Sequence, residues 1–178
     1  MPRPYFDSND KIEEIMRVNH AGEFGAQKIY YGQLKFTKNI KDKIIIKEML
    51  EQELEHLHFF ENEIKHKQLR PTLLLPMWDI FGYMLGAVSG ILGNRAAMVV
   101  TESVEEVIIE HYQEQIDHLS VHDKTNPLLG KIIKFQSDEA EHIEIAVKND
   151  SRKSMLRSPI SKLVQAVCHS AIMLSKKL

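Results

Sequence analysis

The chain has 178 residues, of which 43% are hydrophobic and 27% charged, and its net charge is −2 with histidine neutral. This length suits one domain, here residues 1–178, and the composition excludes an intrinsically disordered chain. The near-neutral charge, with no basic arm, argues against nucleic acid as a partner, and one cysteine, Cys168, excludes an internal disulfide. The N-terminus has no apolar signal core, so we expect a chain that faces the cytosol.

Apolar residues recur at helical spacing through most of the chain, and no segment alternates with a period of two. We therefore predict an all-α fold. The polar run from Asp7 to Asp10 offers N-cap side chains for the first helix. Pro71 and Pro76 bracket a short connector after the second helix. The six predicted helices span about 10–37, 40–67, 77–93, 94–118, 127–149 and 159–177.

The helix near 77–93 is unusually apolar, because no charged residue occurs from Ile80 to Asn94. That stretch is shorter than the roughly 20 residues that span a bilayer, so it indicates a buried helix or one lying in a membrane surface. Gly82, Gly86 and Gly90 recur at every fourth position, which favours close approach of another helix or ordinary core packing.

The last predicted helix begins at Ser158 and Pro159, which we interpret as its N-cap and first helical residue. Together with Trp78 and Tyr83, which occupy interface-like positions, its apolar residues are expected to rest on lipid. That apolar stripe consists of Ile160, Leu163, Val164, Val167, Ala171, Ile172 and Leu174.

Two halves of the chain carry the same pattern: a glutamate, a tyrosine seven positions later and a glutamine three positions after that. The pattern E-x6-Y-x2-Q is formed by Glu23, Tyr30 and Gln33, and again by Glu105, Tyr112 and Gln115. Each copy is followed by an E-x-E-H sequence. It runs from Glu53 to His56 in the first half and from Glu139 to His142 in the second. The order Glu, then Glu-x-x-His, therefore occurs twice.

This repeat predicts a metal centre. Residues three apart on a helix share one face, so each Glu-x-x-His pair can bind one metal ion. The lags from Glu23 to Glu53 and from Glu105 to Glu139, 30 and 34 positions, return each pair to the level of the first glutamate on an antiparallel neighbour. Four-helix bundles that bind two iron ions have this arrangement. Mixed carboxylate and imidazole ligands favour iron, with manganese as the nearest rival.

Several other acids lie near these positions, and the repeat separates them from the predicted ligands. Glu55 and Glu141, one residue before each histidine, point about 100° away and are expected to be solvated or to support the ligands. The remaining neighbours are Glu51, Glu102, Glu106 and Glu110.

For other side chains near the repeat, a purely structural role and a functional role are both considered. Core packing is the favoured role of Tyr30 and Tyr112, with a redox or hydrogen-bonding role as the alternative. His20 faces the same side as Glu23, and it either orients a carboxylate or is a plain histidine near a helix end. We treat the remaining histidines as surface or structural residues: His58, His66, His118, His122 and His169.

Several motifs resemble those of the 5-demethoxyubiquinone hydroxylase family of ubiquinone biosynthesis, whose members are ferritin-like di-iron proteins. The most selective is the string RVNHAGEFGA at 17–26. Val104-Glu105-Glu106, followed by His111-Tyr112, and Asp138 to His142 resemble two further family motifs, and the similarity extends from about residue 12 to 178. Residues 119–130 are slightly shorter than in some relatives, which affects a turn only.

The resemblance implies a ferritin-like four-helix bundle with two additional helices and the same six ligands that the repeat selects: Glu23, Glu53, His56, Glu105, Glu139 and His142. Glu53 and Glu105 are candidates to bridge the two ions. The resemblance places His111 and Tyr112 near the quinone and the electron path.

The implied activity is an O2-dependent monooxygenase reaction on the ring of a prenylated demethoxy-benzoquinol, with two Fe ions per chain and NADH as a possible reductant. We expect peripheral attachment to the cytoplasmic face of a bacterial inner membrane, or to the matrix side of a mitochondrial inner membrane. Other quinone-biosynthesis proteins and a second copy of the chain are possible partners.

Three alternatives remain at this stage. A ferroxidase or iron-storage protein would share all six ligands, but it would not need the uncharged segment. A scaffold that holds the partners of a quinone-synthesis complex would need no metal. Another di-iron enzyme, such as a peroxidase or a hydroxylase of a soluble substrate, would share the centre.

Overall fold

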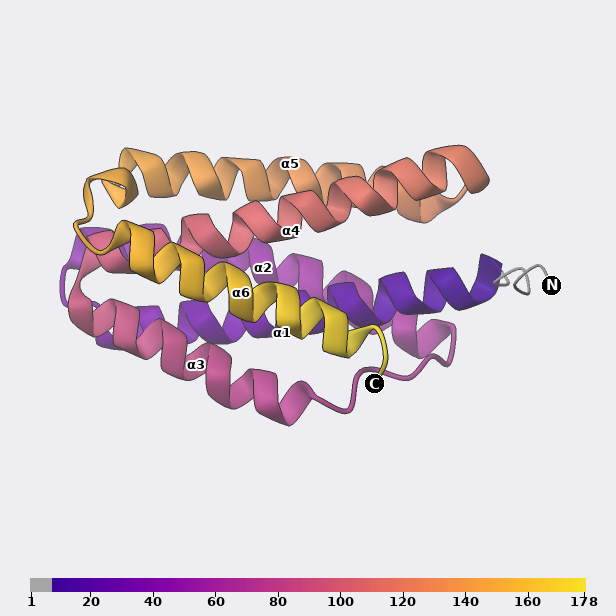
Figure 1. The fold of residues 1–178 in the computed structure, drawn as a ribbon, viewed down its shortest axis with the longest axis horizontal. Helices are drawn as coiled ribbons and strands as arrows, with labels where there is room; N and C mark the ends of the chain where they lie inside the picture. Colours follow the sequence, from indigo (N-terminus) through magenta and orange to yellow (C-terminus); the bar gives the residue numbers. More distant parts are fainter. Residues whose placement is uncertain (1–7) are drawn as a thin grey trace.

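The computed structural model describes residues 8–178, which fold into helices without a strand in that range (Figure 1). The helices are α1 (Ser8–Phe36), α2 (Ile40–His66), α3 (Leu75–Leu92), α4 (Asn94–His122), α5 (Pro127–Lys148) and α6 (Arg157–Ser175), with a short 3-10 helix, η1 (Ser151–Lys153), before the last. The predicted all-α, ferritin-like fold with two additional helices is confirmed.

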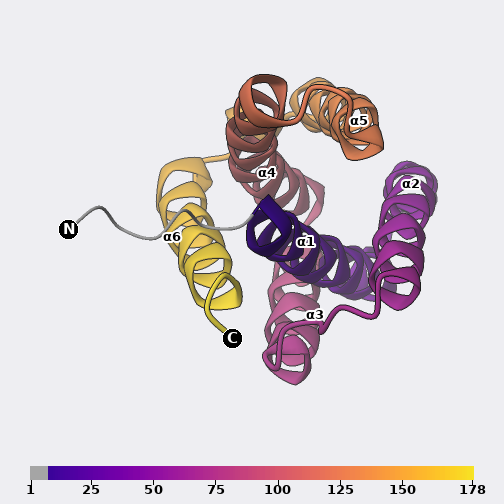
Figure 2. The same ribbon diagram turned by 90° about the vertical axis from the view of Figure 1, so that its right-hand side faces the viewer.

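Four helices form the bundle, as two hairpins that face each other. The view along the bundle shows the hairpin of α1 and α2 beside the hairpin of α4 and α5, with α3 and α6 outside them (Figure 2). Helix α3 packs along α1, and α6 packs across α4 with a smaller contact to α1. Two apolar clusters fill the bundle, one containing Tyr112 and Phe135, the other Tyr30 and Met49.

The glycines of α3 face α1 and let the two backbones touch. A Cβ atom on Gly86 would collide with the carbonyl oxygen of Ile29, and one on Gly82 would lie 2.8 Å from the carbonyl oxygen of Gly25. Gly32 completes the contact from the side of α1, because a Cβ there would meet the backbone of α3. The close approach predicted from the glycine spacing is therefore made inside the chain.

Several helix boundaries differ from the prediction. Helix α3 begins at Leu75, before Pro76, and α6 begins at Arg157, before Ser158 and Pro159. Proline is tolerated throughout the first turn, where backbone N–H groups have no helical partner, so it does not mark the first residue. Helix α4 extends four residues further than expected, to His122. The predicted N-cap residue Asp7 lies outside the described residues.

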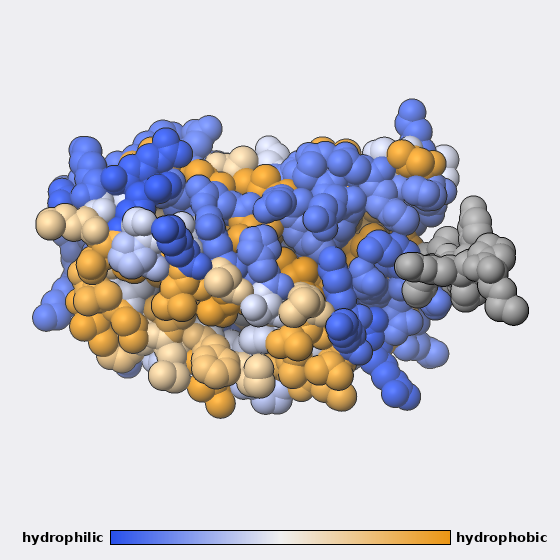
Figure 3. Space-filling view, in the orientation of Figure 1, coloured by the Kyte–Doolittle hydropathy of each residue, from blue (hydrophilic) through white to orange (hydrophobic). Residues whose placement is uncertain are grey.

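One face of the molecule is apolar. In Figure 3, hydrophobic side chains gather over α3 and the adjoining part of α6, whereas hydrophilic side chains cover α4 and α5. The exposed apolar residues of this face, which we call the apolar face, are Met77, Ile80, Phe81, Met84, Val88, Ile91 and Leu92 on α3 and Leu163, Val167, Met173 and Leu174 on α6. Within residues 8–178, α3 is the one helix long and apolar enough to cross a membrane by length and composition, and a third of it is buried in the protein.

The two aromatic residues expected at a lipid interface separate in the structure. Tyr83 is exposed on α3, but Trp78 is only 8% exposed and turns inward. The expectation for Trp78 is therefore wrong. Its indole fills space between α3 and the bundle, because the glycines bring α3 so close to α1 that a residue four positions before Gly82 points into the seam.

Candidate metal centre

The structure brings all six predicted residues together in the middle of the bundle. They form two overlapping groups, in each of which one potential ligand atom from every residue lies within 4.8 Å of the others. One group is Glu23, Glu53, His56 and Glu139, and the other is Glu53, Glu105, Glu139 and His142. Each of these side chains is at most 3% exposed. Four carboxyl groups this deeply buried must be neutralised, either by bound cations or by protons.

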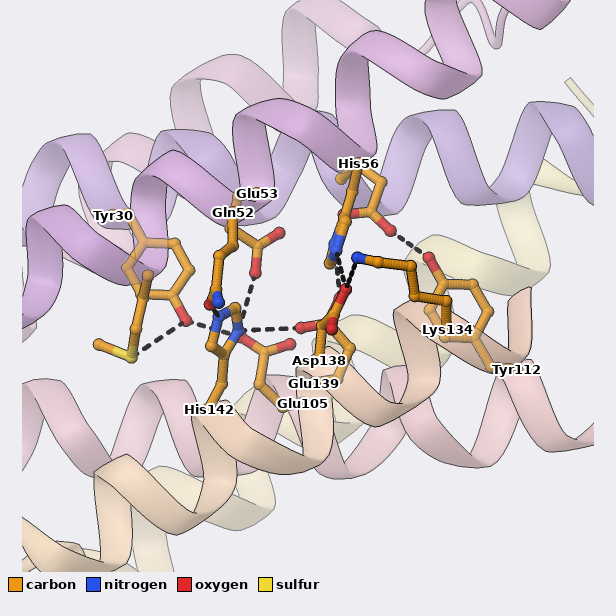
Figure 4. Close-up of polar contacts among 12 residues, drawn as sticks. Tyr30, Gln52, Glu53, His56, Glu105, Tyr112, Lys134, Asp138, Glu139 and His142 are labelled. Carbon is orange, nitrogen blue, oxygen red and sulfur yellow. Dashed lines mark hydrogen bonds and ion pairs between the residues drawn. The ribbon is translucent and has the colours of Figure 1, made fainter. Parts of the chain in front are cut away.

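The histidine nitrogens point at the carboxylates in a way that suits a shared cation. The Nδ1 atom of His56 lies 3.0 Å from Glu139 Oε1, and that of His142 lies 2.9 Å from Glu139 Oε2 (Figure 4). Both nitrogens and both oxygens are buried, yet none of them makes a hydrogen bond of acceptable geometry within residues 8–178. Buried nitrogen and carboxylate oxygen atoms that lie close together without hydrogen bonds can bind metal ions instead, so these residues fit a pair of such ions.

Two carboxylates lie between the two candidate metal positions. Glu53 and Glu139 belong to both groups, whereas Glu23 belongs to the first only and Glu105 to the second only. Membership of both groups makes Glu53 and Glu139 candidates to bridge, and the expectation for Glu105 stays a prediction. Glu105 lies at one end because Tyr30 holds it there.

The pKa values of the centre reflect burial of several acids in one place. Burial and the neighbouring charge of Glu139 raise the pKa of Glu105 to about 8 and that of Glu53 well above its ordinary value. Burial would lower the pKa of both histidines, but their contacts with glutamates prevail and raise it to about 12 for His56 and about 11 for His142. Without a metal ion the centre thus retains protons, and divalent cations must displace them to bind.

Each repeated tyrosine supports a glutamate of the other half of the chain. Tyr30 donates a hydrogen bond to Glu105 Oε1 at 2.9 Å, and Tyr112 donates a hydrogen bond to Glu23 (Figure 4). Burial, together with the nearby carboxylates, raises the pKa of both phenols, so they stay protonated and keep donating. The structure shows both roles that the sequence interpretation weighed: each ring packs in an apolar cluster, and each hydroxyl donates a hydrogen bond to a glutamate.

Sequence reasoning missed two residues that contact the far side of the histidine rings. Asp138 Oδ2 lies 3.1 Å from His56 Nε2, and Gln52 Oε1 lies 2.6 Å from His142 Nε2 (Figure 4). A signal for both was present, since each directly precedes the glutamate of a Glu-x-x-His pair. Aligning the repeat one residue further back would have singled out both positions, though not the histidines that they contact.

A cavity of about 350 Å³ adjoins one end of the centre. It lies between α1, α3, α4 and α6, and its inner wall includes Glu23 and Tyr112, which are at most 3% exposed. Its outer wall includes Phe81 and Leu163 of the apolar face, both more than half exposed. The cavity therefore connects the apolar face with the centre, and nearly all of its lining is apolar.

His111 also lines this cavity, beside Tyr112 on α4. Its Nδ1 atom lies 3.4 Å from Glu114 Oε2, and its Nε2 atom is buried without a hydrogen-bond partner in the described part of the chain. Burial and then the charge of Lys176 lower the pKa of His111, so it is neutral near pH 7. A neutral imidazole beside an apolar cavity can donate or accept one further hydrogen bond.

The other candidates lie apart from the centre. Glu55 and Glu141 are exposed, as expected for solvated residues. His20 is buried and makes no hydrogen bond to Glu23. Burial lowers the pKa of His20, and the charge of Glu61 opposes this effect without overcoming it. Glu102 is buried as well, but it pairs with two arginines rather than with the centre.

Comparison with known proteins gives a consistent result. Residues 10–175 match the family model described as "Ubiquinone biosynthesis protein COQ7". A Dictyostelium discoideum protein named "NADPH-dependent 3-demethoxyubiquinone 3-hydroxylase, mitochondrial" is 44% identical over 169 residues, covering 93% of this chain and 77% of the relative.

Two further relatives come from distant organisms. A Homo sapiens protein with the same name as that of Dictyostelium is 38% identical over 173 residues, covering 96% of this chain and 80% of its own length. A Rhodospirillum rubrum protein named "3-demethoxyubiquinol 3-hydroxylase" is 36% identical over 167 residues, covering 93% of this chain and 78% of the relative. The chain therefore belongs to the COQ7 family of ubiquinone biosynthesis proteins.

Proposed function

We propose that this protein is a di-iron monooxygenase that hydroxylates the ring of a prenylated demethoxy-benzoquinol with O2. The relatives carry that activity in their names, and the six converging residues supply a donor set that suits two iron ions. Glu23 and His56 would hold one ion, Glu105 and His142 the other, and Glu53 and Glu139 would lie between them. Bound iron would supply the redox chemistry that activates O2.

The observation that carries the proposal is the apolar cavity that ends at Glu23 and Tyr112. A cavity of about 350 Å³ falls in the range of small-molecule sites, about 300–1,000 Å³. Its outer wall on the apolar face can accept a prenyl chain, while its inner wall places an aromatic ring beside the centre. In the reaction one ring C–H becomes C–OH, and the second oxygen atom leaves as water with two electrons and two protons from the reductant.

The chain's own residues would position the substrate and keep water out. Tyr112 holds Glu23 at the cavity wall through its hydroxyl, and the apolar lining excludes water from the ring. We place the neutral His111 beside a quinol hydroxyl, where its unpartnered Nε2 atom can make a hydrogen bond. His111 and Tyr112 are therefore our candidates for contact with the quinone and the electron path.

The reductant is a reduced nicotinamide in this proposal. The names of the Dictyostelium and human relatives specify NADPH, where the sequence interpretation had NADH, and the name of the Rhodospirillum relative specifies neither. Supplying each cofactor to the iron-loaded protein with substrate, and following its oxidation, decides between them.

Complementation tests the function directly. A bacterial strain without its own hydroxylase accumulates the demethoxyquinone, and we expect this chain to restore the complete quinone, whereas Glu105→Ala does not. Purified protein from the same strain should contain about two irons, and Glu105→Ala fewer. Glu55→Ala, an exposed neighbour, serves as the control and should restore the quinone. A quinone pool left unchanged by the iron-loaded wild-type chain would refute the proposal.

We further propose that the apolar face rests on a membrane surface, from which the quinol enters the cavity. Supporting this, exposed apolar side chains of α3 and α6 surround the outer wall of the cavity. Replacing Met84 and Leu163 by glutamate should abolish co-flotation with phospholipid vesicles without unfolding the protein, since both side chains are more than half exposed. Glutamate at Val121, exposed on α4, is the matched control and should float as wild type does. Equal flotation of all variants would contradict the proposal.

The alternatives receive less support. A ferroxidase needs an ion path, but the cavity beside Glu23 is almost wholly apolar. A pure scaffold leaves the buried, unsatisfied ligand atoms without a purpose. The relatives' names also specify hydroxylases.

A further inference from the structure

The two halves of the repeat differ at one place that touches the centre. The residue before each Glu-x-x-His pair contacts the histidine of the opposite helix, so Asp138 of α5 meets His56 and Gln52 of α2 meets His142. In all other contacts described above, the halves use the same residue types. One histidine is thus supported by a carboxylate and the other by a neutral amide.

The hydrogen-bond direction follows from the ring geometry. Both histidines turn Nδ1 toward the glutamates of the centre, so Nε2 carries the hydrogen and donates outward when Nδ1 holds a cation. Asp138 Oδ2 accepts at 3.1 Å and Gln52 Oε1 at 2.6 Å. A charged acceptor polarises the donor ring more than a neutral one, which makes Nδ1 of His56 the more basic ligand atom.

The acceptor strength of Asp138 is itself moderated by a lysine. Lys134 Nζ lies 2.7 Å from the same Oδ2 atom that His56 contacts, one turn earlier on α5. The side chain of this lysine is 59% exposed, whereas that of Asp138 is 21% exposed. A series of contacts therefore leads from solvent through Lys134 and Asp138 to the ring of His56. Within the described residues, no cation contacts Gln52.

This difference also coincides with the position of the cavity. His56 shares its group with Glu23, which lines the cavity, while His142 shares its group with Glu105, which does not. The carboxylate-supported histidine therefore belongs to the candidate metal position nearest the substrate cavity.

We infer that Asp138 and Gln52 are positioning residues that make the two metal positions unequal, with the position of His56, beside the cavity, binding iron more tightly. The inference rests on the proposed di-iron function. Asp138 sets this order through the His56 ring, and Lys134 tunes it.

Anaerobic titration with 57Fe(II), followed by Mössbauer spectroscopy, tests the order. In wild type the two iron signals should fill in sequence, and Glu23→Ala identifies the signal of the His56 position by removing it. Asp138→Asn, which keeps the shape but removes the charge, should weaken that position by about 10- to 100-fold. The double variant Asp138→Asn, Gln52→Glu moves the carboxylate to the other histidine and should reverse the filling order.

Two more variants separate tuning from general effects. Lys134→Met should tighten the His56 position, opposite to Asp138→Asn, a result that a merely structural role does not produce. Glu141→Gln removes one charge from the same helix without touching a ligand and should leave both signals unchanged. If Asp138→Asn folds and binds two irons as wild type does, the inference is wrong. If the wild-type chain itself binds no iron, the proposed function fails instead.

Discussion

At the scale of single residues, the two tyrosines of the repeat have the same contact but different surroundings. Tyr112 and its partner Glu23 line the cavity, whereas Tyr30 lies against Met49 on the closed side of the centre. Loss of either hydroxyl leaves a buried glutamate without a donor, but only one of these glutamates faces the proposed substrate.

Tyr112→Phe should therefore lower kcat/KM for the quinol by about 10- to 100-fold, the range found when a partner of a metal ligand is removed. Tyr30→Phe should lower kcat but leave the KM for the quinol unchanged, because Tyr30 has no contact with the cavity. Steady-state kinetics with iron content measured in parallel checks both. Equal changes of KM in the two variants would contradict the assignment of the cavity as the substrate site.

The sequence was sufficient to predict that six residues meet in the centre. Helical spacing puts Glu53 with His56 and Glu139 with His142 on one face. The similar lags in the repeat bring Glu23 and Glu105 to the same level. The contacts of Asp138 and Gln52 were not predictable in the same way. Each reaches a histidine on another helix, so its role depends on how α2 and α5 are rotated against each other. That Glu139 rather than Glu105 belongs to both residue groups has the same origin.

At the scale of helices, one buried carboxylate anchors the start of α6 to the bundle. Glu102 of α4 accepts hydrogen bonds at 3.1 Å from Arg152 of η1 and from Arg157, the first residue of α6. Burial would raise the pKa of Glu102, but the two arginines prevail and lower it. Nothing in the sequence distinguishes Glu102 from its acidic neighbours, since its partners are about 50 residues away.

Glu102→Gln should reduce the free energy of unfolding by about 1–2 kcal/mol at pH 7, since charge-assisted hydrogen bonds are replaced by neutral ones. Because the folded pKa is lowered, this stabilisation is complete above the unfolded pKa of 4.5 and is lost as the pH falls toward the folded value. Urea unfolding of both proteins at pH 7 and near pH 4 measures it. A difference that grows on acidification would have the wrong sign.

The close packing of α3 against α1 depends on glycine, because a Cβ atom at the contact would collide with the backbone of α1. Gly86→Ala should destabilise the protein by about 1–3 kcal/mol, because its Cβ meets the Ile29 backbone, which cannot move aside. Gly130→Ala is the matched control on α5, where a Cβ meets nothing within 4 Å, and it should stabilise the helix by about 0.5–1 kcal/mol. Thermal unfolding compares the two. Equal stability of Gly86→Ala and wild type would show that the helices can separate.

The helix order was predictable from apolar spacing, but the orientation of the apolar helices was not. Both Trp78 and Tyr83 look suited to a lipid interface in the sequence, and only the seam formed by Gly82 and Gly86 decides that the indole turns inward. The first residues of α3 and α6 were misplaced because a proline is compatible with several positions in a first turn.

At the scale of the whole molecule, the centre lies where the two hairpins meet, between the two apolar clusters that also join them. Helices α1 and α4 each contribute one of its residues and α2 and α5 each contribute two, and each tyrosine reaches across to the other hairpin. A cation bound there stabilises only the folded chain.

Iron should accordingly raise the unfolding temperature. At a free Fe(II) concentration 100 times the Kd, the gain is about 2.7 kcal/mol, or roughly 5–10 °C for a chain of this size. Anaerobic calorimetry with Fe(II) and with a chelator measures the shift, which His142→Ala should largely remove. The same unfolding temperature in iron and in chelator would mean that the centre does not bind iron.

Because both hairpins contribute residues to the centre, its occupancy has a consequence for the lifetime of the protein in a cell. Proteases degrade the unfolded fraction of a chain, and under the proposed function that fraction would fall as iron fills the centre. When iron is scarce, more copies would unfold and be degraded, and when iron returns, new copies would persist. The amount of this protein would then follow the iron supply without a dedicated sensor.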